Sequence, residues 1–453
     1  MSGIAGVYSD KDGAAAYLYY MLYALQHRGQ QSCGIATYNN GLMDYYKEQG
    51  LVSDVFKDDR VAQMRGNLAI GHVRMAARGE GFEYPYNQPI VAGYRHGALG
   101  IVHDGCITNA KKLKDDLQMQ GYMFQSNLDT EVIATLIVKN YNMDLEHSII
   151  DTLEMLMGSY ALIVMAENVI YAARDEYGIK PLSIGELNGR YLVASETCAF
   201  DSIGAKFVRD VLPGEVIRIT DKGLDIIRKG DASKRKLGVF EMVYIARPDS
   251  IIDGKSIYLS RLNAGRILAK EHPQDADLVI GAPDSGISFA VGYSEESGIP
   301  YTEGIIKNRY VGRTFIQPNQ ELRDLGVKIK LNPIKEYIQN KRLVLVDDSI
   351  VRGTTMRRTV KMLRDAGAKE IHVRIGSPMV KYSSNLMMDT PTREELVAAM
   401  HTKEEITKMI GADSLEYISL EGLFKAFGGD DFTQGCFTGK FPEGTIYLSL
   451  IHI

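Results

Sequence analysis

One stretch decides how this chain is expected to fold, and it reads Arg342-Leu343-Val344-Leu345-Val346-Asp347-Asp348-Ser349-Ile350-Val351-Arg352-Gly353-Thr354-Thr355. An apolar, β-branched run ends at two adjacent carboxylates. A short turn rich in Ser, Gly and Thr follows, and then a helical pattern begins. In such a strand–loop–helix, backbone N–H groups, hydroxyls and the positive end of the helix dipole converge on an anion. The stretch therefore predicts a phosphate-binding loop.

The two acids of this loop point to the other half of the ligand. Asp347 and Asp348 cannot hold a phosphate, because they repel it. Carboxylates accept hydrogen bonds from vicinal sugar hydroxyls, or help to hold a hard cation that is shared with phosphate oxygens. A ligand with a phosphate at one end and a diol nearby fits both halves of the loop.

Strand and helix patterns alternate on both sides of the loop. Alternation of this kind implies a parallel sheet with helices on both faces. We expect helices at 259–271, 288–296 and 355–366, and strands at 277–281, 342–346 and 370–375.

The first 230 residues or so read differently, as short strands with Gly-rich turns. A charged and polar segment at 228–236 is the best linker candidate, so we expect domains at 1–232 and 233–453. The strands expected here lie at 68–72, 100–103, 160–166 and 191–194, and the helical stretches near 14–26 and 129–139.

Composition limits the class of protein. The chain has 453 residues, of which 45% are hydrophobic and 24% charged, as in ordinary globular proteins. The formal net charge of −5 gives no reason to expect nucleic acid or an anionic membrane as a partner. No apolar run approaches a membrane span, the first residues do not read as a signal peptide, and the four cysteines are scattered. We therefore expect a cytoplasmic protein with reduced thiols.

Two more segments bear on the same ligand. The residues 281–286 follow a strand and open a helix, which places them at the sheet edge where open α/β folds bind ligands. The segment 307–315 carries three cations, and the polar segment 317–330 after it is expected to be a lid that closes over a polyanion.

These residues resemble a known family. The loop at 344–355 is similar to the phosphoribosyl pyrophosphate (PRPP) loop of type I phosphoribosyltransferases. The ordered set of motifs resembles the glutamine PRPP amidotransferase family over nearly the whole chain. This set adds the segments 25–35, 71–74, 129–131, 240–250, 308–316 and 436–439. The resemblance implies an αββα domain of the N-terminal-nucleophile hydrolase type, followed by an α/β phosphoribosyltransferase domain.

The resemblance also implies roles in the second domain. Asp347 and Asp348 would contact the ribose hydroxyls and Mg²⁺, with Ser285 near the metal. The 5′-phosphate would lie against Ser349, Arg352, Gly353, Thr354 and Thr355. The pyrophosphate would be neutralised by Lys307, Arg309 and Lys330. The implied product is phosphoribosylamine, made in the first step of purine synthesis. The implied partners are PRPP, glutamine or ammonia, nucleotide inhibitors and a second copy of the chain, in a homodimer or homotetramer.

The first domain departs from the family pattern. Ser2 stands where the family has its N-terminal cysteine nucleophile, and Asp104, before Gly105, stands where the family has an asparagine that donates to the oxyanion. An ionised Asp104 donates no hydrogen bond, and losing one such donor typically costs on the order of 10²–10³ in rate. The segment 75–78 also differs from the usual Tyr-Ser/Thr stretch. For glutamine recognition, the resemblance implies Arg28, Arg74 and Asp129, and the alternative for Arg74 and Asp129 is a structural ion pair.

Some members of the family bind an iron–sulfur cluster through four cysteines. The matching positions here are Gly238, Ser384, Thr433 and Cys436. One thiolate cannot hold such a cluster, so we expect none.

The main hypothesis is a Mg²⁺-dependent PRPP amidotransferase with an impaired glutaminase half and ammonia as nitrogen donor. Three alternatives stay open. They are an ordinary glutamine-dependent enzyme that works through Ser2, a transferase for another acceptor, and a regulator that binds PRPP or a nucleotide without catalysis.

Overall fold

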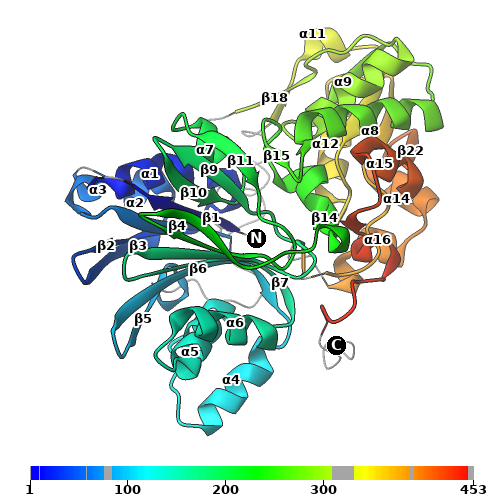
Figure 1. The fold of residues 1–453 in the computed structure, drawn as a ribbon. Helices are drawn as coiled ribbons and strands as arrows, with labels where there is room; N and C mark the ends of the chain where they lie inside the picture. The colour runs from blue at the N-terminus through cyan, green and yellow to red at the C-terminus, as the bar shows by residue number, and fades with distance from the viewer. Residues whose placement is uncertain are drawn as a thin grey trace.

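The structure is a computed structural model that describes residues 2–9, 11–57, 59–75, 84–308, 331–384, 386–387 and 392–446. Two stacked sheets form the N-terminal half, and a smaller sheet between helices forms the C-terminal half (Figure 1). Within the described residues, no helix is long and apolar enough to cross a membrane.

The first sheet has seven strands in the order β11-β9-β10-β1-β4-β2-β3. Strand β1 carries the N-terminus and lies between β4 and β10, antiparallel to both. All seven of its residues are buried, as expected for a central strand covered on both faces. The strands are β1 (Ser2–Tyr8), β2 (Ser32–Asn39), β3 (Leu42–Gln49), β4 (Leu68–Arg74), β9 (Ser183–Leu187), β10 (Arg190–Ala194) and β11 (Lys206–Asp210).

The second sheet has six antiparallel strands in the order β13-β12-β8-β7-β6-β5. It packs face to face on the first sheet around a shared core that includes Ile4, Val102 and Ile163. The strands are β5 (Ile90–Tyr94), β6 (Gly97–Ile107), β7 (Gly158–Ala166), β8 (Val169–Arg174), β12 (Val216–Thr220) and β13 (Gly223–Arg228).

Helices cover the outer faces of both sheets, which gives the expected αββα order. Helix α1 (Ala14–Ala24) and the short α7 (Cys198–Asp201) cover the seven-stranded sheet. Helices α4 (Ala110–Met119), α5 (Asp129–Asn140) and α6 (Leu145–Met155) lie on the other side. The sequence analysis missed α4 and α6. Helix α4 is short of apolar residues, and its buried face holds only Ala110, Leu113 and Leu117.

The C-terminal half contains the predicted parallel sheet, in the order β17-β20-β21-β22. Helices α8 (Ile257–Glu271) and α9 (Gly286–Ser297) pack on one face, and α12 (Thr354–Asp365) and α14 (Lys403–Ile410) on the other. The strands are β17 (Leu278–Gly281), β20 (Arg342–Asp347), β21 (Glu370–Ile375) and β22 (Ser414–Tyr417). The predicted phosphate strand and its helix lie within one residue of their expected bounds.

The two halves are joined by short elements. Strand β14 (Leu237–Gly238) pairs in parallel with β23 (Phe432–Thr433), and a π-helical turn, η4 (Glu241–Ile245), follows. The domain boundary at 232/233 stays a prediction. The remaining short elements are α2 (Val52–Val55), α3 (Arg60–Gln63), α11 (Lys335–Ile338), α13 (Val397–Met400), α15 (Leu420–Phe427), α16 (Gly435–Thr438), β15 (Ile251–Ile252), β16 (Lys255–Ser256), β18 (Ile305–Lys307), β19 (Leu331–Pro333), η1 (Gln26–Arg28), η2 (Tyr84–Tyr86), η3 (Ala232–Lys234) and η5 (Arg393–Glu395).

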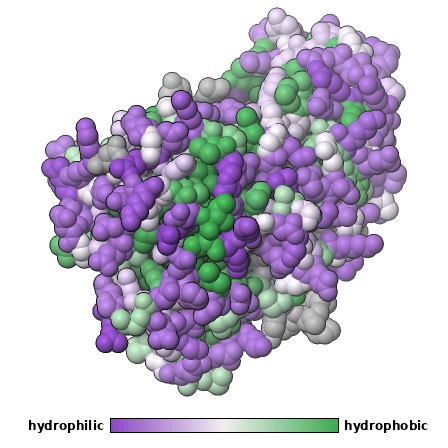
Figure 2. Space-filling view, viewed as in Figure 1, coloured by the Kyte–Doolittle hydropathy of each residue, from purple (hydrophilic) through white to green (hydrophobic). Residues whose placement is uncertain are grey.

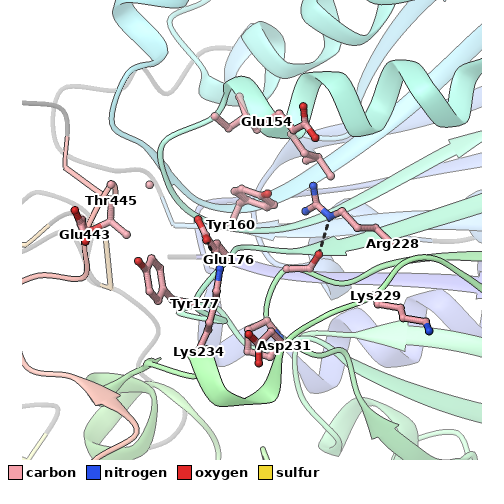
Figure 3. Close-up of a pocket in the computed structure, with 16 residues that line it drawn as sticks. Glu154, Tyr160, Glu176, Tyr177, Arg228, Lys229, Asp231, Lys234, Glu443 and Thr445 are labelled. Atoms are coloured by element: carbon pink, nitrogen blue, oxygen red, sulfur yellow. Dashed lines mark hydrogen bonds and ion pairs between the residues drawn. The ribbon is translucent and has the colours of Figure 1, made fainter.

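The surface carries an apolar band and, within the described residues, a cavity at the edge of the second sheet. Figure 2 shows this band across the middle of a mostly hydrophilic face. Exposed apolar side chains include Phe207 on β11 and Ile226 on β13, the edge strands of the two sheets. A cavity of about 400 Å³ lies between Tyr160, Arg228 and the loop at Tyr177 (Figure 3). None of the predicted site residues lines this cavity.

Candidate active sites

The phosphate loop lies where β20 meets α12. Apolar residues bury β20 until Asp347, and α12 begins six residues after Asp348. The Asp348 N–H donates to Asp347 Oδ1 at 2.9 Å, and the Ser349 hydroxyl donates to Asp348 Oδ2 at 2.6 Å. Gly353, directly before the helix, has a φ of 75°, which a side chain would strain. The local sequence thus holds the two acids at the carboxyl end of the strand.

A second loop joins the first at the same edge of the sheet. The loop after β17 brings the Ser285 hydroxyl to within 2.5 Å of Asp348 Oδ1, to which it donates a hydrogen bond. Burial and the like charge of Asp348 raise the pKa of Asp347 well above its usual range. Carboxylate and hydroxyl oxygens are the hard donors that suit Mg²⁺, so the residues present fit this ion.

The predicted pyrophosphate cations are only partly described. Lys307 ends β18, and its Nζ donates to Asp284 Oδ2 in the loop after β17. Arg352 pairs with Glu395, with 3.2 Å between Nη2 and Oε1. Arg309, Lys330 and the expected lid lie outside the described residues. Their contribution to the site stays a prediction.

Ser2 lies in the N-terminal half as the first residue of β1. It is buried, and it pairs in register with Arg74 of β4. Its backbone N–H donates to Asp104 Oδ1 at 2.8 Å across the space between the two sheets. This contact places the predicted nucleophile beside Asp104, although the two are far apart in the sequence.

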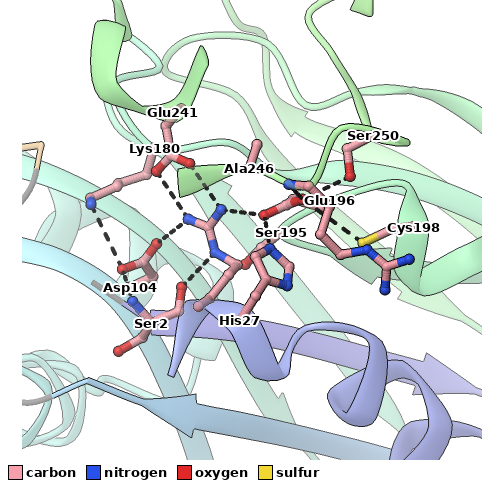
Figure 4. Close-up of polar contacts among 12 residues, drawn as sticks. Ser2, His27, Asp104, Lys180, Ser195, Glu196, Cys198, Glu241, Ala246 and Ser250 are labelled. Atoms are coloured by element: carbon pink, nitrogen blue, oxygen red, sulfur yellow. Dashed lines mark hydrogen bonds and ion pairs between the residues drawn. The ribbon is translucent and has the colours of Figure 1, made fainter. Parts of the chain in front are cut away.

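Arg28 is the centre of a buried ionic network (Figure 4). Its side chain is fully buried, and all five of its N–H donors are used. Its predicted role in binding glutamine stays a prediction. Glutamine could contact this side chain only by replacing one of these partners. The acceptors are Ser2 O at 2.8 Å, Glu196 Oε1 at 2.6 Å, Asp104 Oδ2 at 3.1 Å and the two carboxylate oxygens of Glu241 at 2.9 and 3.0 Å.

Asp104 has partners that the sequence could not reveal. Lys180 Nζ lies 3.8 Å from Asp104 Oδ1, whereas Arg28 contacts the other carboxylate oxygen, Oδ2. Burial acts to raise the pKa of Asp104, but the charges of Lys180 and Arg28 outweigh it and hold this pKa below its usual range. The carboxylate is therefore ionised, and its charge is compensated by cations.

Two predicted glutamine-binding residues remain, and one of them, Arg74, pairs with Ser2 in the sheet. Asp129 begins α5 and accepts a hydrogen bond from Ile107 N at 2.7 Å. The Arg74 guanidinium lies 5.8 Å from the ring centre of Tyr86. Their predicted contacts with an amino acid are not tested by these distances. The divergent residues 76–78 lie outside the described residues.

Gly105 permits the close approach of β6 and β7. A Cβ atom at this position would lie 2.1 Å from Ser159 O, which is a severe clash with backbone. We expect Gly105→Ala to lower the free energy of unfolding by about 1–3 kcal/mol, because the strand must shift. Glutamine-dependent activity should fall as well, because Asp104 would move with the strand. Thermal unfolding measures the first effect. Gly93→Ala on β5 is the control, since its nearest atom would lie 4.0 Å away, and equal effects would contradict the argument.

Two of the four positions that match cluster ligands lie side by side on paired strands. Gly238 pairs with Thr433, and a Cβ at Gly238 would lie 3.3 Å from Met387 Cγ. Cys436 supplies the only thiol of the four positions, and burial raises its pKa. One thiol does not fit an iron–sulfur cluster, so the absence of one remains our expectation.

Sequence reasoning missed three residues of the network around Arg28. Glu241 lies inside a motif that supported the resemblance, yet nothing in the sequence indicated its partner. Glu196 and Lys180 carried no signal at all. A charged residue inside a predicted buried segment is the one clue available, because such a residue needs a partner.

Models of two protein families match the chain. A glutamine amidotransferase domain matches residues 84–202, and a phosphoribosyl transferase domain matches residues 256–376. The two matches follow the order of the two halves of the fold.

Known proteins are similar over nearly the full length. The amidophosphoribosyltransferase of Methanocaldococcus jannaschii is 47% identical over 98% of this chain and 98% of its own, and that of Bacillus subtilis is 46% identical over 97% and 94%. A solved structure of glutamine PRPP amidotransferase from B. subtilis, complexed with ADP and GMP, superposes with a TM-score of 0.91 at 44% identity, and covers 97% of both chains. Another, described as the allosteric regulatory enzyme of purine biosynthesis, has a TM-score of 0.92 at 45% identity, with 97% of this chain and 96% of that chain covered.

Proposed function

The chain belongs to the amidophosphoribosyltransferase family and is a phosphoribosyltransferase enzyme, and from this premise we propose that it makes phosphoribosylamine from PRPP. The observation that carries the proposal is the pair of loops at the sheet edge. There Asp348 accepts hydrogen bonds from Ser285 and Ser349, beside Asp347. Relatives that are 46–47% identical over almost the whole chain bear the name of this activity.

The proposed reaction follows from the charges at this edge. The C1′–oxygen bond breaks as pyrophosphate leaves, and positive charge develops on the ribose ring. Lys307 would stabilise the leaving pyrophosphate, and the two acids would hold the ribose hydroxyls. Mg²⁺, held by Asp347, Asp348 and Ser285, would neutralise charge on the pyrophosphate. A neutral amine attacks C1′ from the opposite face.

The proposed nitrogen donor is glutamine, cleaved by Ser2 after Met1 has been removed. The alternative of an ordinary glutamine-dependent enzyme fits the relatives better than an impaired glutaminase, which they do not support. The cations beside Asp104 also reduce the electrostatic objection to its charge. A hydroxyl needs a nearby base, and the freed α-amine, with a pKa of roughly 7.7–8.0, would supply it.

We also propose that nucleotides regulate the protein and that it self-associates. The B. subtilis relative was solved with ADP and GMP, which supports nucleotide regulation here. Self-association into a dimer or tetramer is also proposed, and the apolar edge strands β11 and β13 are candidate contact surfaces. The names of the two curated relatives reported above favour neither another acceptor nor a regulator without catalysis.

Ser2→Ala is expected to abolish pyrophosphate release with glutamine and to leave release with ammonium. The alanine variant keeps a small second residue, so Met1 removal should continue and the α-amine should still form. The measurement is pyrophosphate release from PRPP and Mg²⁺ with either nitrogen source. Ser9→Ala, just past the other end of β1, is the control. Equal loss with both sources would contradict the assignment of Ser2, and release with neither amine present would contradict the proposed reaction.

A further inference from the structure

The ionic network beside Ser2 lacks one positive charge. Three carboxylates, those of Asp104, Glu196 and Glu241, are at most 1% exposed, and they contact two buried cations, Arg28 and Lys180, which are 0% and 2% exposed. His27 lies 2.8 Å from Glu196, but its side chain is 24% exposed and lies at the rim. Buried carboxylates are costly unless cations match them. Among the described ion pairs within 4 Å, the interior of the network therefore has one cation fewer than carboxylates while Ser2 N is a neutral peptide nitrogen. Arg261 is also buried and attracts Glu196 and Glu241, but it forms no ion pair within 4 Å with either of them.

The unmatched charge lies at a definite atom. Asp104 Oδ2 receives Arg28 Nη2 at 3.1 Å, whereas Lys180 Nζ stays 3.8 Å from Oδ1, beyond hydrogen-bond distance. Within the described part of the chain, the hydrogen bond to Oδ1 comes from Ser2 N at 2.8 Å. Removal of Met1 turns this nitrogen into an α-amino group, which is cationic when protonated. The missing positive charge would then appear at the atom that lacks it.

We propose that Asp104 is a positioning residue that binds the α-ammonium group of Ser2 once Met1 has been removed, in place of donating to the oxyanion. This inference rests on the proposed function, in which Ser2 is the nucleophile. The carboxylate faces the amine nitrogen, so it orients the amine that must take the hydroxyl proton of the same residue. An asparagine at this position would supply a neutral amide, and the ionic network would then have one negative charge fewer.

A pH effect follows from the same geometry. A carboxylate at hydrogen-bond distance stabilises the ammonium form, so it raises the pKa of the α-amine, while only the neutral amine can serve as a base. Arg28 and Lys180 oppose this effect but are already outnumbered by the carboxylates. Burial lowers the pKa of His72 to about 3 and that of His103 to about 4, so both rings are neutral. The charged and titratable groups around Ser2 and Asp104 are His103 from β6, His72 and Arg74 from β4, Arg28 from η1 and Lys180 from the loop after β8, with Glu196, Glu241 and Arg261 behind Arg28.

The test compares the pH profile of glutamine hydrolysis by the full-length wild type with that of the Asp104→Asn variant. The midpoint of the rising limb is expected to fall by about one pH unit in the variant, which raises the rate near neutral pH about tenfold. If the asparagine acted only as a new oxyanion donor, it would raise the plateau of the pH–rate profile and leave the midpoint of its rising limb unchanged. Identical midpoints would overturn the proposal. Pyrophosphate release with ammonium reports whether the variant has folded.

A second variant and a second readout keep the test independent of turnover. Lys180→Met removes a competing cation from the same carboxylate, and should move the midpoint upward. The rate at which an acylating reagent modifies the α-amine, followed by mass spectrometry over the same pH range, should show the same shifts. A lack of shift in both variants by this readout would also overturn the proposal.

The outcomes separate this inference from the proposed function. Met1 found in the intact mass would overturn both. A freed amine with a raised midpoint of acylation, but no glutamine hydrolysis, would overturn the nucleophile assignment and support the binding of the amine by Asp104. Glutamine hydrolysis with an unshifted midpoint in Asp104→Asn would support the function and overturn the role of Asp104.

Discussion

Replacement of both Asp347 and Asp348 by asparagine is expected to lower PRPP-dependent pyrophosphate release by roughly 10²–10⁴-fold. Each hydrogen bond to a charged group contributes about 1.5–3 kcal/mol, and each tenfold in rate or affinity corresponds to about 1.4 kcal/mol. The asparagine amides keep the shape of the loop but lose the two charges proposed to hold the ribose and Mg²⁺. The loss should appear with ammonium and with glutamine alike, because both nitrogen sources share this step.

The stability of the fold, unlike the activity, should not fall when Asp347 is replaced by asparagine. Burial and the charge of Asp348 raise the pKa of Asp347, so the folded state holds a proton on this group more tightly than the unfolded state does. A carboxyl whose pKa is higher in the folded state than in the unfolded state makes the fold more stable as the pH falls, and less stable at a pH where the group is ionised. Asp347→Asn should therefore have a thermal midpoint at neutral pH no lower than that of the wild type. Lost activity with retained stability distinguishes a ligand contact from a folding defect.

The same pKa gives a pH dependence of binding. In the wild type, the affinity for PRPP with Mg²⁺ should fall as the pH drops through the raised pKa of Asp347, because the protonated acid no longer attracts the cation. Calorimetric titrations at several pH values measure this slope, and Asp347→Asn should flatten it.

The control for these variants is Asp365→Asn at the end of α12. Asp365 is an exposed acid that pairs with Lys361, and exposed pairs of this kind contribute about 0.3–0.5 kcal/mol. Its loss should leave pyrophosphate release unchanged. If the double variant at the loop behaves like this control, the proposed sugar and metal site is wrong.

The contrast between the two halves shows what sequence patterns can predict. The phosphate loop was predictable because its signal is local. An apolar run, two acids, a turn and a helix follow one another, and β20 and α12 begin and end within one residue of expectation. Strand order in the αββα half was accessible only through the resemblance, because short antiparallel strands carry little information about their neighbours.

The network at Ser2 could not be predicted, because its members are distant in the sequence. Arg28 and Glu241 are separated by 213 positions, and Ser2 and Asp104 by 102. The sequence pattern indicated only that an ionised Asp104 cannot donate a hydrogen bond to the oxyanion. Folding brings Arg28 and Lys180 to the same carboxylate, so the charge has partners that no local pattern reveals.

Arg28→Met is expected to lower the free energy of unfolding by about 3–5 kcal/mol. This is the largest loss of stability that we expect from the single substitutions proposed here. Removal of one cation from a buried ionic network leaves its partners with uncompensated charge. Here Asp104, Glu196 and Glu241 would lose this cation, and Glu241 belongs to the segment that joins the halves. Thermal and urea unfolding, each followed by two probes, measure the loss and show whether the halves come apart separately.

Arg266→Met on α8 is the matched control for this prediction. Arg266 pairs with Glu295, and both side chains are partly exposed, at 40% and 47%. Its removal should cost about 0–1 kcal/mol. An equally small effect of Arg28→Met would mean that the buried contacts do not carry the stability assigned to them.

The pH dependence of the loss gives a sharper check than its size. In the wild type, the pKa of Glu196 is held below its usual range, because His27 and Arg28 outweigh the effect of burial. Against the effect of burial, the pKa of Asp104 is also lowered, by Lys180 and Arg28. Carboxyls with lowered pKa values contribute stability that is present above their unfolded values of about 4 and lost as the pH falls below them. Without Arg28, the stranded carboxylates regain stability by taking up protons, so the difference between variant and wild type should shrink between about pH 7 and about pH 4. A difference that stays constant over this range would mean that lost packing around the long Arg28 side chain, and not unpaired charge, accounts for the destabilisation.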